Sequence, residues 1–104
     1  MNKNPDTKSV QTNKTLYKPF VSSAKNKKYS VYVMKDNKKR LIHFGDSNME
    51  QYKDKLGEYS KLNHLDPKRR KSYLARAKGI RNKKGELTWK DKNTSNFYSI
   101  KYLW

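Results

Sequence analysis

The chain has 104 residues, with 26 Lys and Arg against 9 Asp and Glu, a formal net charge of +17, and a hydrophobic content of only 33%. This length allows one small domain, and the lack of cysteine excludes disulfides and cysteine-based zinc sites as supports for a small core. No apolar run approaches the roughly 18 residues of a membrane span, and the first residues lack the apolar stretch of a signal peptide. We therefore expect a soluble protein without a membrane partner, made in a reducing compartment.

The excess of positive charge points to an anionic partner. A net charge of +17 on so short a chain repels itself, so a polyanion or an acidic protein surface is expected to neutralise it. Nucleic acid is the leading candidate. Aromatic residues make up 12% of the chain, including 8 Tyr, which is more than a disordered, solvating tail usually carries. The sequence therefore predicts that part of the chain folds.

Residues 1–28 are predicted to form a basic extended arm in front of a compact domain at residues 29–104. The arm is polar and carries seven Lys against one Asp. Its apolar cluster surrounds Pro19, which disfavours a helix, so the cluster is expected to be extended and to dock onto a partner or onto its own domain. The docking residues would be Leu16, Tyr17, Phe20 and Val21. A disordered arm with incidental hydrophobic residues is the alternative.

Residues 29–46 alternate between apolar and polar side chains, which predicts a β-hairpin that turns near Asp36 and Asn37. Turns of two or four residues give the strands the same parity. In either case one face of the hairpin is apolar. Its members are Val31, Val33, Ile42 and Phe44.

A first helix is predicted directly after the hairpin. Ser47 and Glu50 have the spacing of a capping box, with Asp46 as an alternative cap. Apolar side chains then recur at helical spacing as far as Tyr59, although Gly57 weakens the middle of the element.

A second helix is predicted at about 67–78. Asp66 and Pro67 supply a cap and a favourable first residue, and Gly79 stands where the helix would stop. After a polar connection, residues 97–104 alternate as an aromatic strand that would join the hairpin. The predicted fold class is therefore α+β: a small antiparallel sheet, made from the hairpin and the C-terminal strand, with two short helices.

The second helix and the residues after it contain nine Lys and Arg within positions 68–84 and no acidic residue. This basic block consists of Lys68, Arg69, Arg70, Lys71, Arg76, Lys78, Arg81, Lys83 and Lys84. On a helical projection, Arg69 and Arg76 border the apolar arc on one side, and Lys71 and Lys78 border it on the other. The block is predicted to bind nucleic acid or an acidic partner.

Arg70 falls inside the apolar arc, where an unpaired guanidinium is costly. It is expected to meet a carboxylate, such as that of Asp46 or Asp54, or a ligand phosphate. Because no base-reading DNA-binding motif is present, nucleic acid should be bound at its phosphates, without sequence preference and in a salt-sensitive way. A helix whose charges serve only solubility is the alternative, but solubility does not require a single sign of charge.

Catalytic residues are not evident in the sequence. There is no cysteine nucleophile, and His43 and His64 have no partners at the spacing of a metal site or a catalytic triad. We predict no enzymatic activity, no metal site, no cofactor and no small-molecule substrate.

Several short motifs lie within residues 27–104. They are Tyr29-Ser30-Val31-Tyr32-Val33, Phe44-Gly45-Asp46, Arg69-Arg70-Lys71-Ser72-Tyr73 with Arg76, and the terminal Trp104. Together they resemble a small, basic, functionally uncharacterised family of large tailed bacteriophages and giant DNA viruses. The resemblance implies a viral protein with a compact α+β module, and it brings no catalytic residues.

A fainter resemblance supplies another alternative. Val31-Tyr32 followed by His43-Phe44-Gly45 is similar to the paired strand motifs of GIY-YIG nucleases. The resemblance implies that Arg70 takes the place of the helix arginine of those enzymes. The metal-binding glutamate has no clear counterpart unless Glu86 serves. Ser30 replaces the first motif glycine and His43 replaces a tyrosine, so the nuclease would be degenerate.

The leading hypothesis is a viral structural protein, a minor capsid or auxiliary (cementing) component of a double-stranded DNA phage or virus particle. It would pass through the host cytoplasm into the virion, bind other virion proteins near the shell or the portal, and bind the DNA phosphate backbone non-specifically through its basic face. The main alternative is a non-specific nucleic-acid-binding protein that acts during infection.

Overall fold

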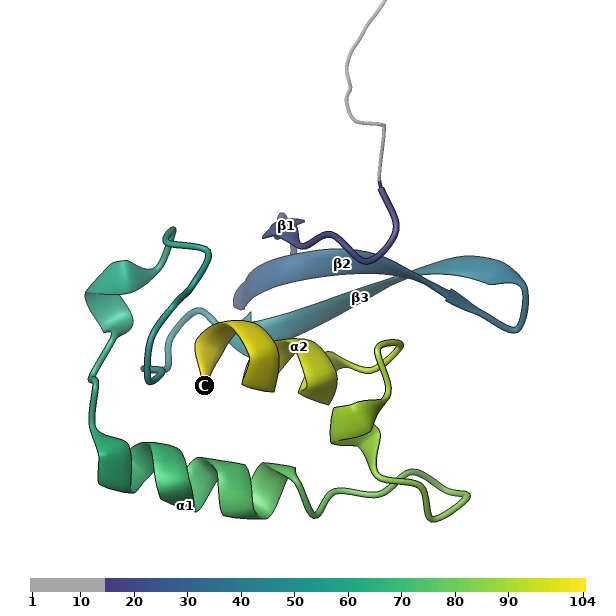
Figure 1. Cartoon of the computed structure of the whole chain (residues 1–104). Coiled ribbons are helices and arrows are strands. Elements are labelled where there is room, and N and C mark those ends of the chain that lie inside the picture. The colour runs from purple at the N-terminus through teal and green to yellow at the C-terminus, as the bar shows by residue number, and fades with distance from the viewer. Residues whose placement is uncertain (1–14) are drawn as a thin grey trace, which may run out of the picture.

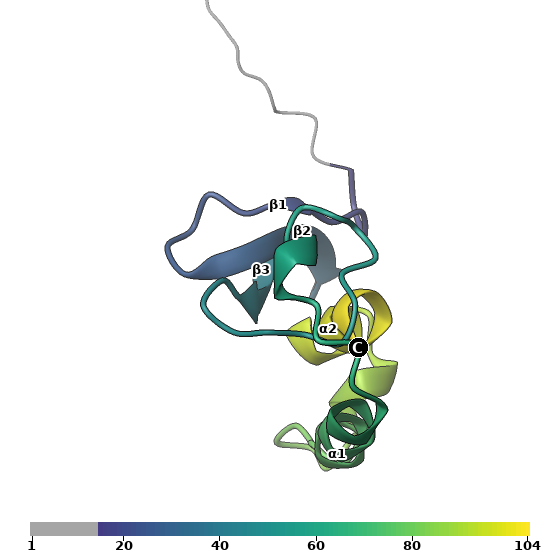
Figure 2. The same cartoon turned by 90° about the vertical axis from the view of Figure 1, so that its left-hand side faces the viewer.

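The computed structural model describes residues 15–104. Three strands, β1 (Phe20–Val21), β2 (Lys27–Lys35) and β3 (Lys38–Asp46), form an antiparallel sheet in that order. Two α-helices follow, α1 (Pro67–Ala77) and α2 (Ser95–Leu103), with short 3-10 helices at Ser60–Leu62 and Thr88–Lys90. Figures 1 and 2 show α2 between the sheet and α1. The predicted α+β class is confirmed, and none of the described helices is long and apolar enough for a membrane span.

The β-hairpin is also confirmed. Asp36 and Asn37 both have positive φ angles, of 53° and 63°, as a two-residue type I′ turn requires. The register pairs Val31 with Ile42, and the predicted apolar face is buried, with Val31 at 0% exposure and Phe44 at 3%. This face forms the sheet side of the hydrophobic core.

Aromatic rings of α2 cover the apolar face of the hairpin. Tyr98 is buried and stacks on Phe44 with ring centroids 5.7 Å apart, while Tyr102 lies 6.2 Å from the same ring. Leu103 completes the core at 1% exposure. Offset aromatic pairs of this kind add to the stabilisation from buried apolar area, which helps a core that contains few aliphatic residues.

The predicted C-terminal strand is wrong, because residues 95–103 form α2. Thr94 caps this helix through its side-chain oxygen, which accepts a hydrogen bond from the amide of Phe97. Tyr98 and Tyr102 are four residues apart, which places them on one face of a strand and also makes them neighbours at i and i+4 on a helix. Their rings lie parallel at 6.3 Å. The aromatic pattern is thus compatible with both elements, and the cap favours the helix.

The third strand of the sheet comes instead from the segment before the hairpin. β1 pairs with β2, and Phe20 stacks on Tyr32 with centroids 5.7 Å apart. The amide of Tyr17 donates to the carbonyl of Tyr32 at 2.7 Å. The predicted docking residues, Leu16, Tyr17, Phe20 and Val21, therefore lie along their own domain. Residues 1–14 of the predicted arm lie outside the described residues.

The first predicted helix does not form, and residues 47–59 follow an irregular path. The carboxylate of Asp54, which is 5% exposed, accepts hydrogen bonds from the amides of Leu56 and Tyr59 at 2.8 Å and from the hydroxyl of Tyr29 at 2.5 Å. Glu50 pairs with Arg69 rather than with a helix N-terminus. The capping-box pattern is overridden because a buried carboxylate satisfies the loop amides.

A second set of buried polar contacts fixes the start of this loop. The ammonium group of Lys28 donates to the carbonyl of Met49 at 2.7 Å and to the side-chain oxygen of Gln51. Gln51 is 0% exposed and donates in turn to Asn63 at 2.6 Å. Burial lowers the pKa of Lys28, with a partly compensating effect of nearby carboxylates. The loop is therefore held against the end of the hairpin by hydrogen bonds rather than by helix formation.

Tyr29 and Tyr98 are expected to ionise late in an alkaline titration. Burial raises the pKa of both hydroxyls, to about 12 for Tyr98, and the hydrogen bond to Asp54 raises that of Tyr29 further. Their contribution to stability is present below the ordinary pKa of 10.0 and is lost as the pH rises through the folded-state values. Tyrosinate absorbance should be followed as the pH is raised. Replacing either residue with Phe should reduce only the absorbance increase that occurs at the highest pH. A loss from the early part would contradict the burial of that ring.

Candidate nucleic-acid interface

α1 carries most of the basic block, and its predicted position is confirmed. The side chain of Asp66 accepts from the amides of Lys68 and Arg69 at 2.9 and 3.4 Å, and Pro67 occupies the first helical turn. Ala77 is the one buried residue of the helix. Figures 1 and 2 place α1 on the side of α2 remote from the sheet, so most of its circumference faces solvent.

An aromatic stack attaches α1 to the end of the chain. The rings of Tyr73 and Trp104 lie nearly parallel, at 7°, with centroids 4.0 Å apart, and the hydroxyl of Tyr73 shares a hydrogen bond of 2.9 Å with Ser99. At the other end of α1, the side-chain amide of Asn96 donates to the carbonyl of Ala77 at 2.8 Å, which satisfies a helix-end acceptor. These contacts fix the rotation of α1 and hence the direction of its cations.

Arg70 does not pair with either of the acidic residues expected from the sequence. Its Nε donates to the main-chain oxygen of Trp104 at 2.7 Å, and its guanidinium lies over the ring of Tyr52 at 5.2 Å. Asp54 is committed to the loop described above. The expectation of Asp46 or Asp54 as the partner is therefore wrong, and a carbonyl-type oxygen and an aromatic face take that role.

Two more cations of the block are held by contacts within the protein. Arg69 forms an ion pair with Glu50, with Nη1 and Oε1 2.8 Å apart, and this pairing lowers the pKa of Glu50. Arg81 donates to the carbonyl of Gly85 at 2.6 Å and so closes the loop after α1. Arg69, Arg70 and Arg81 thus have structural partners.

The other six cations of the block are exposed. Arg76 lies over Tyr73 at 6.0 Å, and Lys78 lies over Trp89 at 4.9 Å. Within residues 15–104, no hydrogen bond or ion pair engages the ammonium groups of the remaining four, Lys68, Lys71, Lys83 and Lys84. We call these four the unpartnered lysines.

A second basic patch, which the sequence analysis did not single out, lies at the tip of the hairpin. Its members are the exposed residues Lys35, Lys38, Lys39 and Arg40. Lys35 and Lys38 stand opposite each other in the register, a like-charge arrangement that destabilises a hairpin and that a bound anion would relieve. In the sequence, the feature that indicates this patch is the cluster of cations on both sides of the Asp36 and Asn37 turn.

The strand motifs of the nuclease resemblance are paired in the hairpin, but its two charged residues, Arg70 and Glu86, are not brought together. Arg70 lies in the first turn of α1, whereas Glu86 follows that helix and accepts a 3.0 Å hydrogen bond from Asn82. A helix of eleven residues spans about 16 Å. The Nδ1 atom of His43 and the hydroxyl of Ser30 share a hydrogen bond of 2.6 Å, and the described part of the chain has no cluster of three metal-ligating side chains.

Comparison of the chain with models of known families, with curated proteins and with solved structures finds no match. The chemistry of the surface can still be stated from its side chains. Lysine ammonium groups are compact charges on rotatable stems, which suits them to phosphate oxygens rather than to the fixed donor and acceptor pattern of base edges. The exposed side of α1 and the loop after it therefore present ammonium groups of this kind to solvent.

Proposed function

We propose that this chain is a structural protein of a double-stranded DNA phage or virus particle, a minor capsid or cementing component that binds other virion proteins and packaged DNA. The observation that carries the proposal is the exposed cationic side of α1 and of the loop after it, where four lysines have no partner within the described residues. Neutralising DNA phosphates with such groups releases condensed counterions, which drives binding.

The placement of the acidic residues supports an adhesive role. Asp54 and Asp66 are committed to loop and helix-cap hydrogen bonds, and Glu50 neutralises a single arginine. The formal charge of +17 is what remains after all 9 acidic residues are counted against the 26 basic ones, so an external anion is needed to offset it. The resemblance of the strand, Phe44-Gly45-Asp46 and α1 motifs to a family of tailed phages and giant DNA viruses supports the particle as the setting.

The direct test is mass spectrometry of purified particles, followed by their structure determination. The protein should be present in a reproducible copy number, with α1 near DNA density. If the protein is found in infected cells but not in particles, the structural role is wrong and the alternative of a nucleic-acid-binding protein acting during infection replaces it.

Binding to duplex DNA should weaken strongly as salt is added. If five or six phosphates are engaged, the slope of log affinity against log salt concentration should be about −5. The measurement is a fluorescence anisotropy titration at several salt concentrations, with two unrelated sequences as probes. Equal slopes and affinities for both sequences are expected, and a slope near zero would contradict phosphate binding.

A further inference from the structure

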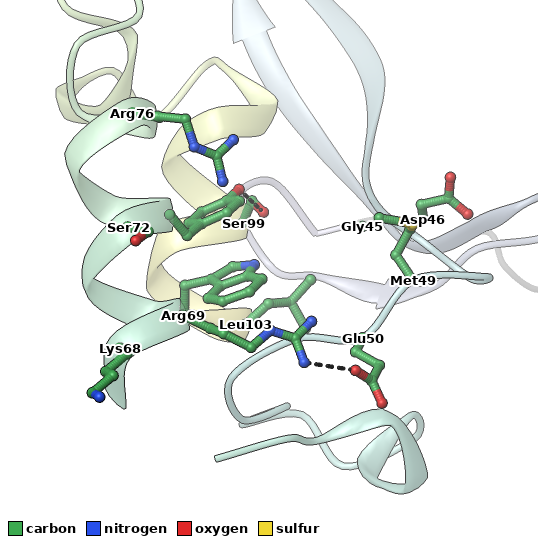
Figure 3. Close-up of a pocket in the computed structure, with 12 residues that line it drawn as sticks. Gly45, Asp46, Met49, Glu50, Lys68, Arg69, Ser72, Arg76, Ser99 and Leu103 are labelled. Carbon is green, nitrogen blue, oxygen red and sulfur yellow. Dashed lines mark hydrogen bonds and ion pairs between the residues drawn. The ribbon is translucent and has the colours of Figure 1, made fainter. Parts of the chain in front are cut away.

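A groove of about 610 Å³ lies between α1 and residues 45–50, which comprise the end of β3 and the start of the loop after it. In Figure 3, Arg76 projects from α1 into this groove, and Met49 faces it from the opposite wall. Leu103 and Trp104 line it from the end of α2. Only one of the four unpartnered lysines lines it, at the start of α1, so the groove and the proposed DNA contact are largely separate surfaces.

The groove combines a rigid apolar lining with open apolar surface. Leu103 is 1% exposed and is held in the core, whereas Met49 is 61% exposed. Trp104 is held in place by its stack on Tyr73. A cavity of this size with a mixed apolar and polar lining is typical of sites that bind a small ligand or a few residues of chain.

The two walls of the groove carry opposite charges. Lys68, Arg69 and Arg76 lie on the α1 wall, and Asp46 and Glu50 lie on the other. Arg69 and Arg76 are seven residues apart, which places them on one face of the helix about 10 Å apart along its axis. An occupant with two anionic groups at this spacing would match the α1 wall.

Both arginines can accept such an occupant. The ion pair of Arg69 with Glu50 crosses the groove (Figure 3), and its side chains are 49% and 53% exposed. Exposed pairs of this kind contribute little to stability, so an incoming carboxylate can replace Glu50 at small cost. The guanidinium of Arg76 has no hydrogen bond or ion pair within residues 15–104, and its planar shape suits a bidentate carboxylate.

We infer that this groove binds a short acidic peptide segment of a partner protein. Two carboxylates would pair with Arg69 and Arg76, and an apolar side chain between them would pack on Met49 and Trp104. In a polyproline II conformation, residues three apart lie on one face about 9 Å from each other, close to the spacing of the arginines. The inference rests on the proposed function, because it names the surface that holds another virion protein.

A peptide fits the groove better than single-stranded nucleic acid. A phosphate backbone would bring its charges beside the carboxylates of Asp46 and Glu50 as well as beside the arginines, and the repulsion would offset the gain. A peptide carries its acids only on the side that faces α1. Its main-chain amides can donate to Glu50 on the other side.

The test is an NMR titration of the full chain with a blocked Glu-Leu-Pro-Glu peptide, using a blocked Gln-Leu-Pro-Gln peptide as the matched control. The acidic peptide should produce saturable shifts of the Trp104 indole N–H and of the Met49 and Arg76 amides. The control should bind at least about tenfold more weakly. Equal binding of the two peptides, or no saturable shift, would overturn the inference. Tighter binding of an oligothymidylate than of the acidic peptide, followed through the same signals, would also overturn it.

Two variants separate the groove from the DNA-binding surface. Arg76→Gln should weaken binding of the acidic peptide by about tenfold, whereas Lys84→Gln, in the loop beyond α1, should leave it unchanged. Unchanged amide shifts elsewhere would show that both variants fold. If the peptide does not bind while salt-dependent DNA binding and particle incorporation persist, only the groove assignment fails. If the protein is absent from particles, the proposed function fails.

Discussion

Replacing Gly45 with valine is expected to destabilise the protein by about 3 kcal/mol. Gly45 has a φ angle of 79°, which is strained for a β-branched residue. A Cβ at this position would lie 2.8 Å from Cδ1 of Leu103 and 3.0 Å from Cδ of Lys28, well inside the optimal separation of carbon atoms. Both neighbours are 1% exposed, so neither side chain can move into solvent without opening the core.

Urea denaturation of the unsubstituted protein and of Gly45→Val measures this effect as a shift of the unfolding midpoint, with the same dependence of the unfolding free energy on urea concentration. Gly57→Val is the matched control, because Gly57 has a similar φ angle of 94° but no atom lies within 4 Å of the place that a Cβ would take there. The control should show only the backbone strain, about 1 to 2 kcal/mol. Equal destabilisation by the two substitutions would contradict the close contact of Gly45 with α2 and β2.

The elements predicted correctly from the sequence are those whose signals are local. The hairpin follows from alternation and from Asp36 and Asn37, two residue types that tolerate positive φ. α1 follows from the Asp66 and Pro67 start, where one side chain caps two amides. In both cases, residues close in sequence supply the decisive contacts.

The elements predicted wrongly are decided by contacts between distant residues. The loop at 47–59 depends on Asp54 meeting Tyr29 and on Lys28 meeting Gln51, and no spacing within the loop reveals those partners. The C-terminal segment becomes helical where the apolar face of the hairpin needs a cover, because Tyr98 and Tyr102 can both reach Phe44 from a helix. The spacing of the aromatic residues alone leaves the strand and the helix equally plausible.

The candidate site was predictable as a region but not in its details. A run of cations without acids stays at the surface in almost any fold, because burying unpaired charges is costly, so the basic block could be identified from composition. The sequence does not reveal that Arg70 is held by a contact within the protein while the lysines are not, because its partner, Trp104, lies 34 residues away. The same holds for the groove, whose two walls come from distant segments.

Replacing the four unpartnered lysines with glutamate should weaken duplex DNA binding at least about a thousandfold at low salt and should flatten the salt slope by about 3 to 4. The reason is that each of these ammonium groups is expected to neutralise one phosphate. The variant should fold, because Lys68 and Lys71 lie near the start of α1, where negative side chains favour the helix dipole. Anisotropy titrations at several salt concentrations measure both quantities.

The matched control reverses four exposed lysines outside the basic block, namely Lys18, Lys25, Lys53 and Lys61. Each Lys→Glu change alters the charge by two, so both variants have the same net charge and experience the same long-range repulsion from DNA. The control should therefore lose some affinity at low salt but should retain most of the salt slope. If the two variants lose affinity and slope equally, total charge rather than the surface of α1 and its loop holds the DNA. In that case the hairpin tip and the rest of the surface share the contact, and the interface proposed for α1 is wrong.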